Sequence, residues 1–554
     1  MRLIQLFGVG IVLVIFARLF QLQIIQHRDY LKFARRNYAR PQVIKSPRGR
    51  ILDRNGKVIA SDVLSFDIYL PLDSDHSLFN FLQCDTIGNY IVVHRKPFEL
   101  VAKLAEHSED YRGVQIIVSP LRRYWLGEIF SHPLGYIAKI HKSELRGDYK
   151  LGDLIGKSGI EKNYESFLRG KDGYKYIVTD AYGRELGALE EYISPQPGKD
   201  IILTIDSDLQ RYAYEILPKG AIVACDPKTG EILIYVSKPG YDPNSFVLGS
   251  KFVKSILTDT LHPLWDRVRN AQYPPGSVFK LAIAAIALEK KLITPERKFT
   301  CTGKFSIGKY KYRCWSVHHT VDLYNAIVQS CDIYFYKLGI ILGVNNIHET
   351  VKLGFGSPTG IDLPNESKGF VPSKAFYNSK YGRRRWGKGI PAILAIGQGE
   401  ILVTPLQLLR FIAALANYGV TYTPHLVRYI QDKEGRPIGA PRVKEFKLPL
   451  SEETISFIRR AMRGVVNDEN GTGRLAKLPD IIVCGKTGTA ENPHGKDHAW
   501  FVCFAPYDDP KIALVVFVEN GGMGGGVAAP IARKILKRFF EKYPVQMDRA
   551  DRIN

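Results

Sequence analysis

The stretch Tyr273–Glu289 reads YPPGSVFKLAIAAIALE and joins a proline–glycine stop to a strongly apolar run. Alanine, leucine and isoleucine on nearly every side predict a buried helix from Val278 onward. Ser277 and Lys280 are one helical turn apart and share a face, so the amine can reach the hydroxyl. The helix start also offers backbone N–H groups to an oxyanion. The stretch therefore predicts a serine nucleophile that is activated without a histidine.

Two further short motifs follow this serine in the sequence. Ser330-Cys331-Asp332 lies between apolar helical runs, and Lys486-Thr487-Gly488-Thr489 lies in the strand-like run IIVCGKTGTA. The pattern S-x-x-K alone arises by chance in long chains, but S-x-x-K, S-x-[N/D] and K-T-G in this order are typical of penicillin-recognising serine enzymes. A strand that carries K-T-G can pair with an extended peptide, its lysine can hold a carboxylate, and Gly488 lets a substrate backbone approach closely.

Composition limits the class of protein. With 554 residues, 45% of them hydrophobic, the chain can bury more than one core and is not a disordered protein. Its 77 Lys and Arg residues outnumber 55 Asp and Glu residues, which gives a formal net charge of +22. Such a charge suits nucleic acid, anionic lipid or an anionic wall polymer. Because the sequence carries no zinc-finger, helix-turn-helix or RNP signature, we expect a membrane surface or polyanionic surroundings rather than nucleic acid.

Residues 3–25 form an almost uninterrupted apolar run that is long enough to cross a bilayer. A cleaved signal peptide is the alternative, but glutamines follow the run in place of a small-x-small cleavage site. We therefore expect a transmembrane anchor after a cytoplasmic end of residues 1–2. Basic residues just after the run favour a cytoplasmic C-terminal side by the positive-inside rule, although a long following domain weakens that rule.

A linker divides the rest of the chain. Tyr192–Lys199 contains two prolines and a glycine, which mark a domain boundary. Before it, the turn DRNG between two alternating apolar runs predicts a β-hairpin. The predicted parts are a first domain of residues 26–196 with an inserted lobe at about 71–119, a second domain of residues 197–545, and a tail of residues 546–554.

Strand-like runs lie at both ends of the second domain, with helical sequence between them. Two runs flank a Pro-Lys-Thr-Gly turn, and three more precede a closing helix. The predicted strands lie in Ala221–Ser237, Ile481–Ala490, His498–Pro506 and Lys511–Asn520, and the helix is Val527–Tyr543. This order predicts an α+β fold in which one antiparallel sheet is split across the sequence and covered by helices.

Taken together, the motifs resemble those of the class B penicillin-binding proteins of the elongation type. The resemblance rests on RLFQLQI in the anchor, on RGRILDRNG, RRYWLGEIFSHPLGYI and GKSGIEKNYESFLRG in the first domain, and on DPKTGEIL, YPPGSVFK, SCD, GQGEILVTPLQ and KTGTA in the second. It implies the penicillin-recognising serine transpeptidase fold, with a five-stranded antiparallel sheet covered by helices and an all-helical subdomain. It also implies an N-terminal β-rich pedestal of the dimerisation type and a transmembrane helix.

The resemblance further implies a peptidoglycan D,D-transpeptidase that cross-links stem peptides during cell-wall elongation and is a target of β-lactams. Ser277 would attack the penultimate D-Ala carbonyl and form an acyl-enzyme, with Lys280 as its base. Ser330 and Lys486 would relay a proton to the leaving amine. The backbone N–H groups of Ser277 and Thr489 would form the oxyanion hole.

Substrate binding is implied for the K-T-G strand. Lys486, Thr487, Gly488 and Thr489 would line the substrate, with the two threonines on its terminal carboxylate. The middle motif departs from many relatives, which have asparagine where this chain has Asp332. Because a carboxylate cannot donate as an amide does, either Asp332 pairs with a lysine or the substrate contact differs.

Partners and location follow from the same resemblance. The expected partners are peptidoglycan stem peptides, β-lactams, the cytoplasmic membrane, a polytopic glycosyltransferase and other proteins of the elongation complex. We expect a single-pass protein of the cytoplasmic (inner) membrane with its catalytic domain on the outer, periplasmic side, because stem peptides are cross-linked there. A β-lactamase and a non-catalytic penicillin sensor or scaffold are the alternative functions, and the pedestal motifs favour the transpeptidase.

The cysteines suggest a metal site. Cys301, Cys314, His318 and Cys331 follow the pattern C-x12-C-x3-H-x12-C, and the last cysteine is adjacent to Ser330. Four such ligands can hold a tetrahedral structural zinc, and some elongation-type relatives have a metal in this region. A Cys301–Cys314 disulfide and plain packing are the alternatives. The acyl-transfer chemistry itself requires no cofactor.

Overall fold

The computed structural model describes residues 2–28, 30, 39–72, 84–87, 90–96, 98–106, 114–179, 185–248, 250–308, 310–383 and 385–545. The predicted tail 546–554 and parts of the predicted lobe 71–119 lie outside the described residues. Contacts divide the chain into two compact units, one of Met1–Gly49, Asp62–Arg123 and Phe167–Lys199, and one of Arg50–Ser61, Tyr124–Ser166 and Asp200–Asn554. The second unit thus includes two segments that precede the predicted linker.

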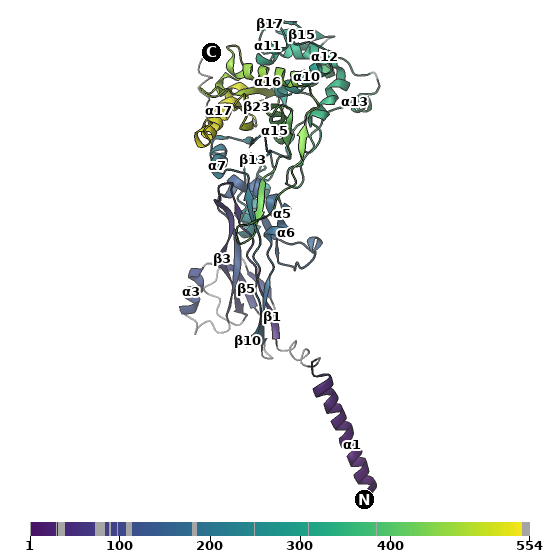
Figure 1. Ribbon diagram of the computed structural model, residues 1–554, viewed down its shortest axis with the longest axis vertical. Coiled ribbons are helices and arrows are strands. Elements are labelled where there is room, and N and C mark those ends of the chain that lie inside the picture. The colour runs from purple at the N-terminus through teal and green to yellow at the C-terminus, as the bar shows by residue number, and fades with distance from the viewer. Residues whose placement is uncertain are drawn as a thin grey trace. The chain divides into compact units, whose positions relative to one another are not determined.

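The N-terminal helix α1 (Arg2–Phe20) continues into a π-helical turn, η1 (Gln21–Ile25) (Figure 1). Within the described ranges, it is the one helix long and apolar enough to cross a membrane, and its apolar window Phe7–Ile25 is 0% buried. Unburied apolar side chains over this length are typical of a segment surrounded by lipid. The helix fits a single-pass membrane anchor.

The first unit is rich in β-structure. One antiparallel sheet consists of β1 (Ala39–Ile44), β9 (Gly173–Thr179) and β10 (Glu185–Ile193). In a second group, β3 (Val58–Pro71) pairs with β5 (Tyr90–Lys96) and with β6 (Gln115–Tyr124), and β5 pairs with β4 (Cys84–Ile87). Leu104 of α3 (Phe98–Glu106) packs against Ile68, Leu70 and Val93, which gives this group a small core of its own.

The second unit is built on a five-stranded sheet. Its strands are β12 (Gly220–Cys225), β13 (Ile232–Lys238), β22 (Cys484–Ala490), β23 (His498–Ala505) and β24 (Ile512–Val518). They lie in the order β13-β12-β24-β23-β22, and every neighbouring pair is antiparallel. The last three strands in sequence thus continue the sheet from the edge of β12, which confirms the predicted split sheet.

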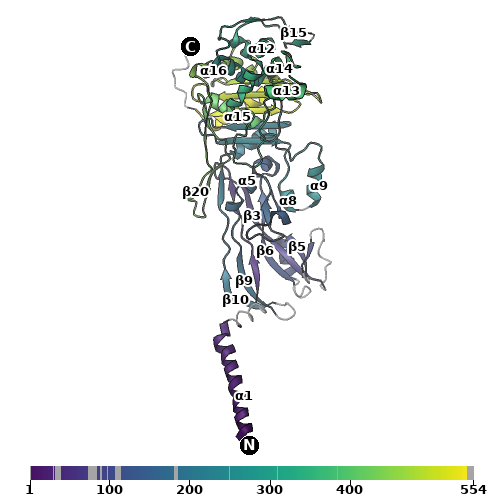
Figure 2. The same cartoon turned by 90° about the vertical axis from the view of Figure 1, so that its right-hand side faces the viewer.

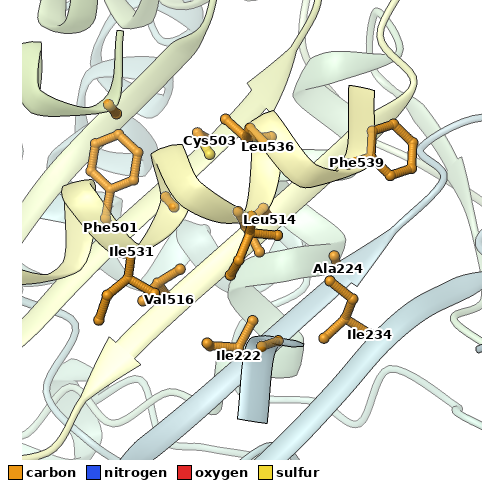
Figure 3. Close-up of a cluster of buried hydrophobic side chains, with 14 of the residues drawn as sticks. Ile222, Ala224, Ile234, Phe501, Cys503, Leu514, Val516, Ile531, Leu536 and Phe539 are labelled. Carbon is orange, nitrogen blue, oxygen red and sulfur yellow. The ribbon is translucent and has the colours of Figure 1, made fainter. Parts of the chain in front are cut away.

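One face of this sheet packs on the closing helix. Ile222 and Ala224 of β12 and Leu514 and Val516 of β24 point to the same side, as alternate residues of a strand do, and meet Leu536 of α17 (Gly524–Lys542) (Figure 3). The helix α7 (Ser207–Ile216) packs against β13 and α17. The closing helix begins at Gly524, three residues before the predicted Val527, so part of the glycine run is helical. A Cβ on Gly524 would lie 2.2 Å from the backbone oxygen of Gly488, so only glycine fits at this position. The glycine run lets the first turn of the helix press against β22.

Helices between β13 and β22 cover the opposite face and extend beyond it (Figure 1). They are α10 (Lys280–Glu289), α11 (Leu323–Val328), α12 (Asp332–His348), α14 (Gly389–Ala395), α15 (Pro405–Ala416) and α16 (Glu452–Asn467). The buried helix expected from Val278 begins instead as a 3-10 turn, η4 (Gly276–Phe279), followed by α10. Two short antiparallel pairs add to the predicted helical subdomain: β14 (Phe299–Cys301) with β17 (His319–Val321), and β15 (Lys304–Ile307) with β16 (Tyr310–Arg313).

Candidate active site

The nucleophile candidate Ser277 lies in η4, which presses against the K-T-G strand β22. Gly276 has φ +56°, and a Cβ on it would lie only 2.4 Å from the backbone oxygen of Thr489. Its N–H donates to the backbone oxygen of Gly397 at 2.9 Å. Glycine alone combines this left-handed conformation with such a close approach. The turn thus holds a partly exposed Ser277 beside β22.

Lys280, at the start of α10, has a fully buried side chain. Its Nζ donates to the backbone oxygen of Ser330 at 2.9 Å, to Ser330 Oγ at 3.2 Å and to Asp332 Oδ1 at 2.7 Å. These bonds account for all three donors of an ammonium group. Of the two alternatives for the aspartate in the middle motif, the structure shows the pairing with a lysine.

Ser330 links the two motif lysines. Lys486 Nζ hydrogen-bonds Ser330 Oγ at 2.8 Å and the backbone oxygen of Thr487 at 3.1 Å. Burial, together with the nearby charge of Lys280, lowers the pKa of Lys486 well below its ordinary value. A neutral Lys486 amine can accept the hydroxyl proton of Ser330. The Ser330 hydroxyl therefore connects two different lysines. Lys280 is ion-paired with Asp332, whereas the lowered pKa of Lys486 favours its neutral form.

Ser330 itself has an unusual backbone. It is 6% exposed and adopts φ +54°, a left-handed conformation that is uncommon for a residue with a side chain. Such a conformation costs on the order of 1–3 kcal/mol and is often found at functional sites. The bend places Ser330 between α11 and α12, with its hydroxyl directed at both lysines.

The K-T-G residues lie on the last strand in the sheet order. Lys486, Thr487 and Gly488 pair with β23, with Lys486 opposite Val502. A Cβ on Gly488 would lie 2.9 Å from Val278 Cγ1 and 3.1 Å from the backbone oxygen of Pro275. The glycine is therefore required for the approach of the serine turn. The predicted closeness of Gly488 to a substrate backbone stays a prediction.

Thr472 belongs to the same site but was not among the predicted residues. Its Oγ1 lies 2.9 Å from Thr487 Oγ1, and its backbone N–H donates to the backbone oxygen of Val328 at 3.4 Å, two residues before Ser330. It therefore bridges the middle motif and the K-T-G strand. The only sequence signal was the flanking pair Gly471 and Gly473, which indicates a tight loop and no chemistry.

Gln398 is a second neighbour of the site. Its Nε2 donates to the backbone oxygen of Thr489 at 3.5 Å. It belongs to the GQGE motif, for which the sequence alone predicts no chemical role. Its position beside η4 and β22 makes it part of the wall around Ser277.

The four candidate metal ligands come together. One ligand atom from each of Cys301, Cys314, His318 and Cys331 lies within 4.8 Å of every other. His318 Nδ1 is 3.6 Å from Cys301 Sγ and 3.4 Å from Cys314 Sγ. Three sulfurs and one imidazole nitrogen at such separations fit a tetrahedral zinc.

Two thiols of this cluster have pKa values shifted in opposite directions. A hydrogen bond from Cys331, together with one from His318, lowers the pKa of Cys314, and the same pair contact raises the pKa of Cys331. Thiolate is the form that binds metal, so the lowered pKa favours ligation by Cys314 alone, and the case for the cluster rests on its geometry. Cys301 and Cys314 are both free thiols in the structure, so the disulfide alternative is not what the structure shows. Cys314 Sγ also accepts the backbone N–H of Asp332 at 3.3 Å, which connects the cluster to the middle motif.

Comparison with known proteins agrees with this site. Residues 220–537 match the penicillin-binding protein transpeptidase domain, and residues 81–203 match the penicillin-binding protein dimerisation domain. The chain is 32% identical to the peptidoglycan D,D-transpeptidase MrdA of Haemophilus influenzae over 97% of this chain and 90% of that protein. It is 31% identical to MrdA of Escherichia coli over 94% and 91% of the two chains.

Solved structures show the same fold. Penicillin-binding protein 2 from Helicobacter pylori, in a complex with MreC, superimposes with a TM-score of 0.77 at 30% identity and covers 91% of this chain and 100% of that one. Penicillin-binding protein 2 of Pseudomonas aeruginosa, in complex with WCK 5153, gives a TM-score of 0.71 at 32% identity, with 93% and 99% coverage. The chain therefore belongs to the penicillin-binding proteins of the elongation type, which makes it a serine D,D-transpeptidase of peptidoglycan and a β-lactam target.

Proposed function

We propose that Ser277 is the acylated residue and that Lys280, Ser330 and Lys486 move its proton. The observation that carries this proposal is that both lysine amines hydrogen-bond the one hydroxyl of Ser330. Lys280 is also one turn from Ser277 along the same helical segment. The activated serine therefore needs no histidine.

The proton path starts from the ion-paired state of Lys280. A proton passes from Lys280 to Ser330 Oγ while the Ser330 hydroxyl proton passes to Lys486, so one lysine becomes neutral as the other becomes charged. The neutral Lys280 then takes the Ser277 proton as the oxygen attacks the D-Ala carbonyl carbon. The charged Lys486 then passes its proton through Ser330 to the leaving D-Ala amine. Asp332, at 2.7 Å, stabilises the ammonium of Lys280 at the start and end of this cycle.

Substrate contacts are assigned to the K-T-G strand. Lys486 and the hydroxyls of Thr487 and Thr489 bind the terminal carboxylate of the stem peptide. The backbone N–H groups of Ser277 and Thr489 stabilise the oxyanion, since Gly276 brings these two residues together. Thr472 acts as a positioning residue, because its hydroxyl at 2.9 Å from Thr487 Oγ1 can donate to it and leave the Thr487 proton free for the carboxylate.

The Cys/His cluster is assigned a structural zinc. Cys301, Cys314, His318 and Cys331 would hold the ion, which supplies no step of the reaction. Its effect would be to fix the backbone next to Ser330, through the bond from Asp332 N–H to Cys314 Sγ. One zinc per chain, by elemental analysis of protein purified without chelator, is the expected result. A Cys314→Ser variant should lose it, and a variant of the strand cysteine, Cys503→Ser, should keep it.

The catalytic unit is placed outside the cytoplasmic membrane. Stem peptides are cross-linked on that side, and the apolar helix Phe7–Ile25 is the segment that would cross the membrane. Partners of the elongation machinery, including a polytopic glycosyltransferase, fit this placement. Support comes from relatives: a similar penicillin-binding protein 2 is solved with MreC, and another similar chain belongs to a peptidoglycan synthase complex. A periplasm-dependent reporter fused after residue 554 should be active.

A fluorescent penicillin tests the catalytic assignment. The full-length protein in detergent should be labelled on Ser277 alone, as read by peptide mapping, and Ser277→Ala should abolish the label. Ser451→Ala, which changes a helix-capping serine of α16, is the matched control and should keep it. Label that persists in Ser277→Ala contradicts the assignment. Release of label within seconds would instead favour a β-lactamase.

A further inference from the structure

Two segments of the second unit carry positive charge without any acid. Residues 303–320 contain Lys and Arg at four positions, residues 374–390 contain them at six, and neither segment contains Asp or Glu. The whole chain, by contrast, has 55 acidic residues to 77 basic ones. The described basic side chains of the two segments that are exposed are Lys304, Lys311, Arg313, Lys374, Lys380, Arg383, Arg385 and Lys388.

The two segments lie side by side. The hairpin β15–β16 belongs to the first, and the second consists of α13 (Lys374–Tyr381) and the loop that leads to α14. A Cβ on Gly389 would lie 2.6 Å from the Tyr312 hydroxyl oxygen, so the hairpin and the start of α14 are in contact. Figure 2 shows β15, α12, α13 and α14 together in this part of the second unit. The two basic segments are thus neighbours on the second unit (Figure 2), and together they are called the basic–aromatic surface.

Aromatic side chains are interspersed among these charges. Trp315 is 59% exposed and Tyr381 is 44% exposed. Flat, partly apolar rings beside basic groups suit a ligand that has both anionic groups and apolar C–H faces, as an acidic glycopeptide does. Lys380 contributes less, because it is paired with Glu400 at 2.7 Å. Arg383, Arg385 and Lys388 follow Lys380 in the same segment and are exposed, so we take these three as the groups to test.

Each segment is attached to a catalytic motif. On the hairpin side, Trp315 Nε1 donates to the backbone oxygen of Gln329, the residue before Ser330, at 3.1 Å. On the other side, Tyr377 donates to Glu400 at 2.6 Å, in the GQGE motif whose Gln398 reaches the K-T-G strand. The basic–aromatic surface therefore borders the active site next to both the middle motif and the strand.

We propose that this basic–aromatic surface binds the second peptidoglycan strand, the one that supplies the acyl acceptor, through the carboxylates of its stem peptides. The inference rests on the proposed function, in which the first strand is held on the K-T-G strand and acylates Ser277. A second acidic chain must then approach the same carbonyl from outside the site. Arginine guanidinium groups bind carboxylates in pairs of hydrogen bonds, which suits Arg383 and Arg385.

Co-sedimentation with purified peptidoglycan sacculi tests the inference. The full-length protein in detergent is compared with the triple variant Arg383→Gln, Arg385→Gln, Lys388→Gln. The control, Lys477→Gln, Arg533→Gln, Lys534→Gln, removes three exposed charges elsewhere in the second unit. Sacculi whose carboxylates have been amidated are the second probe. Thermal unfolding of each variant checks that the fold is retained.

The surface variant should bind native sacculi about tenfold more weakly than the wild type and the control, since each exposed charge contributes modestly. Wild-type binding should fall to a similar level on amidated sacculi and with rising salt. Equal binding by the surface variant and the wild type, equal loss in the control, or unchanged binding to amidated sacculi would overturn the inference. Failure of the proposed function would show separately, as a wild type that penicillin does not label.

Discussion

Replacing Asp206 by alanine should destabilise the second unit more than any comparable change at a neighbouring acid. Its carboxylate is 0% exposed and lies between the start of α7 and the end of α17. It accepts the backbone N–H groups of Asp208 at 3.0 Å and Leu209 at 3.1 Å, the Nζ of Lys542 at 2.7 Å and the hydroxyl of Tyr543 at 2.5 Å. The Asp206 side chain thus caps the start of α7 and also bonds to the end of α17.

The magnitude follows from these contacts. Loss of a helix N-cap costs about 1 kcal/mol. Removal of one partner of a fully buried ion pair costs about 3–5 kcal/mol, but Lys542 is 29% exposed and can turn to Asp208, so that cost is reduced. We expect Asp206→Ala to lower the free energy of unfolding by about 2–4 kcal/mol. Asp206→Asn keeps a capping oxygen and should lose about half of that.

Differential scanning calorimetry of the detergent-solubilised protein measures the effect. In a unit of this size, about 2 °C of melting temperature corresponds to 1 kcal/mol, so a decrease of about 4–8 °C is expected. Asp208→Ala is the matched control, because Asp208 contacts the same Lys542 at 3.0 Å but is 52% exposed. Its cost should stay below about 1 kcal/mol. Equal decreases for the two variants would refute the argument from burial.

The pH dependence of this difference has a definite sign. Burial alone would raise the pKa of Asp206, but hydrogen bonds from Lys542 and Tyr543 outweigh it and hold the pKa below its ordinary value. A carboxyl group with a depressed pKa stabilises the fold above its unfolded pKa of about 3.9 and loses that contribution as pH falls through the folded value. The gap between the wild type and Asp206→Ala should therefore be constant at neutral pH and narrow below about pH 4.

Three further predictions concern the active site. Thr472→Val should slow penicillin acylation about tenfold while Thr472→Ser restores it, because only the hydroxyl can orient Thr487; equal rates for the two variants would contradict this. Lys486→Met should slow acylation by at least about a hundredfold. Because the pKa of Lys486 is depressed, the wild-type rate should fall on the acid side as that amine becomes protonated, and a flat stopped-flow pH profile would argue against its role. Cys314→Ser should slow acylation more than Cys503→Ser does, whereas equal rates would leave the metal without influence on Ser330.

Much of the sheet could be predicted because its signals are local. Strand-like apolar runs identified all five strands, and their positions at the two ends of one domain predicted a single split sheet. The strand order, with β12 beside β24, comes from the structure alone. The start of the closing helix was wrong because glycine in a run normally indicates a loop. Here a Cβ on Gly524 would lie 2.2 Å from the backbone oxygen of Gly488, so a tertiary contact overrides the local preference. Likewise, β2 (Ile51–Leu52) pairs in parallel with β11 (Asp200–Leu203), which attaches it to the second unit across a long sequence distance.

The chemistry of the site could be predicted as far as motifs carry it. Ser277, Lys280, Ser330, Asp332 and the K-T-G strand do converge, as their order indicated. The motifs did not predict which side chains contact one another. Nothing in the sequence says that Lys280 is ion-paired to Asp332 at 2.7 Å or that Thr472 reaches Thr487 at 2.9 Å. These contacts depend on where separate helices cross, which no local pattern encodes.

The position of Cys331 beside Ser330 connects these two parts of the site. A residue with a side chain stays at φ +54° only when its surroundings fix it on both sides. Before Ser330, the backbone oxygen of Gln329 accepts a bond from Trp315 at 3.1 Å, and after it, the N–H of Asp332 donates to Cys314 Sγ at 3.3 Å. Both contacts come from the loop that carries the Cys/His cluster. The loop therefore contacts the backbone on both sides of the strained serine, and this is the route by which the proposed zinc would influence the position of Ser330.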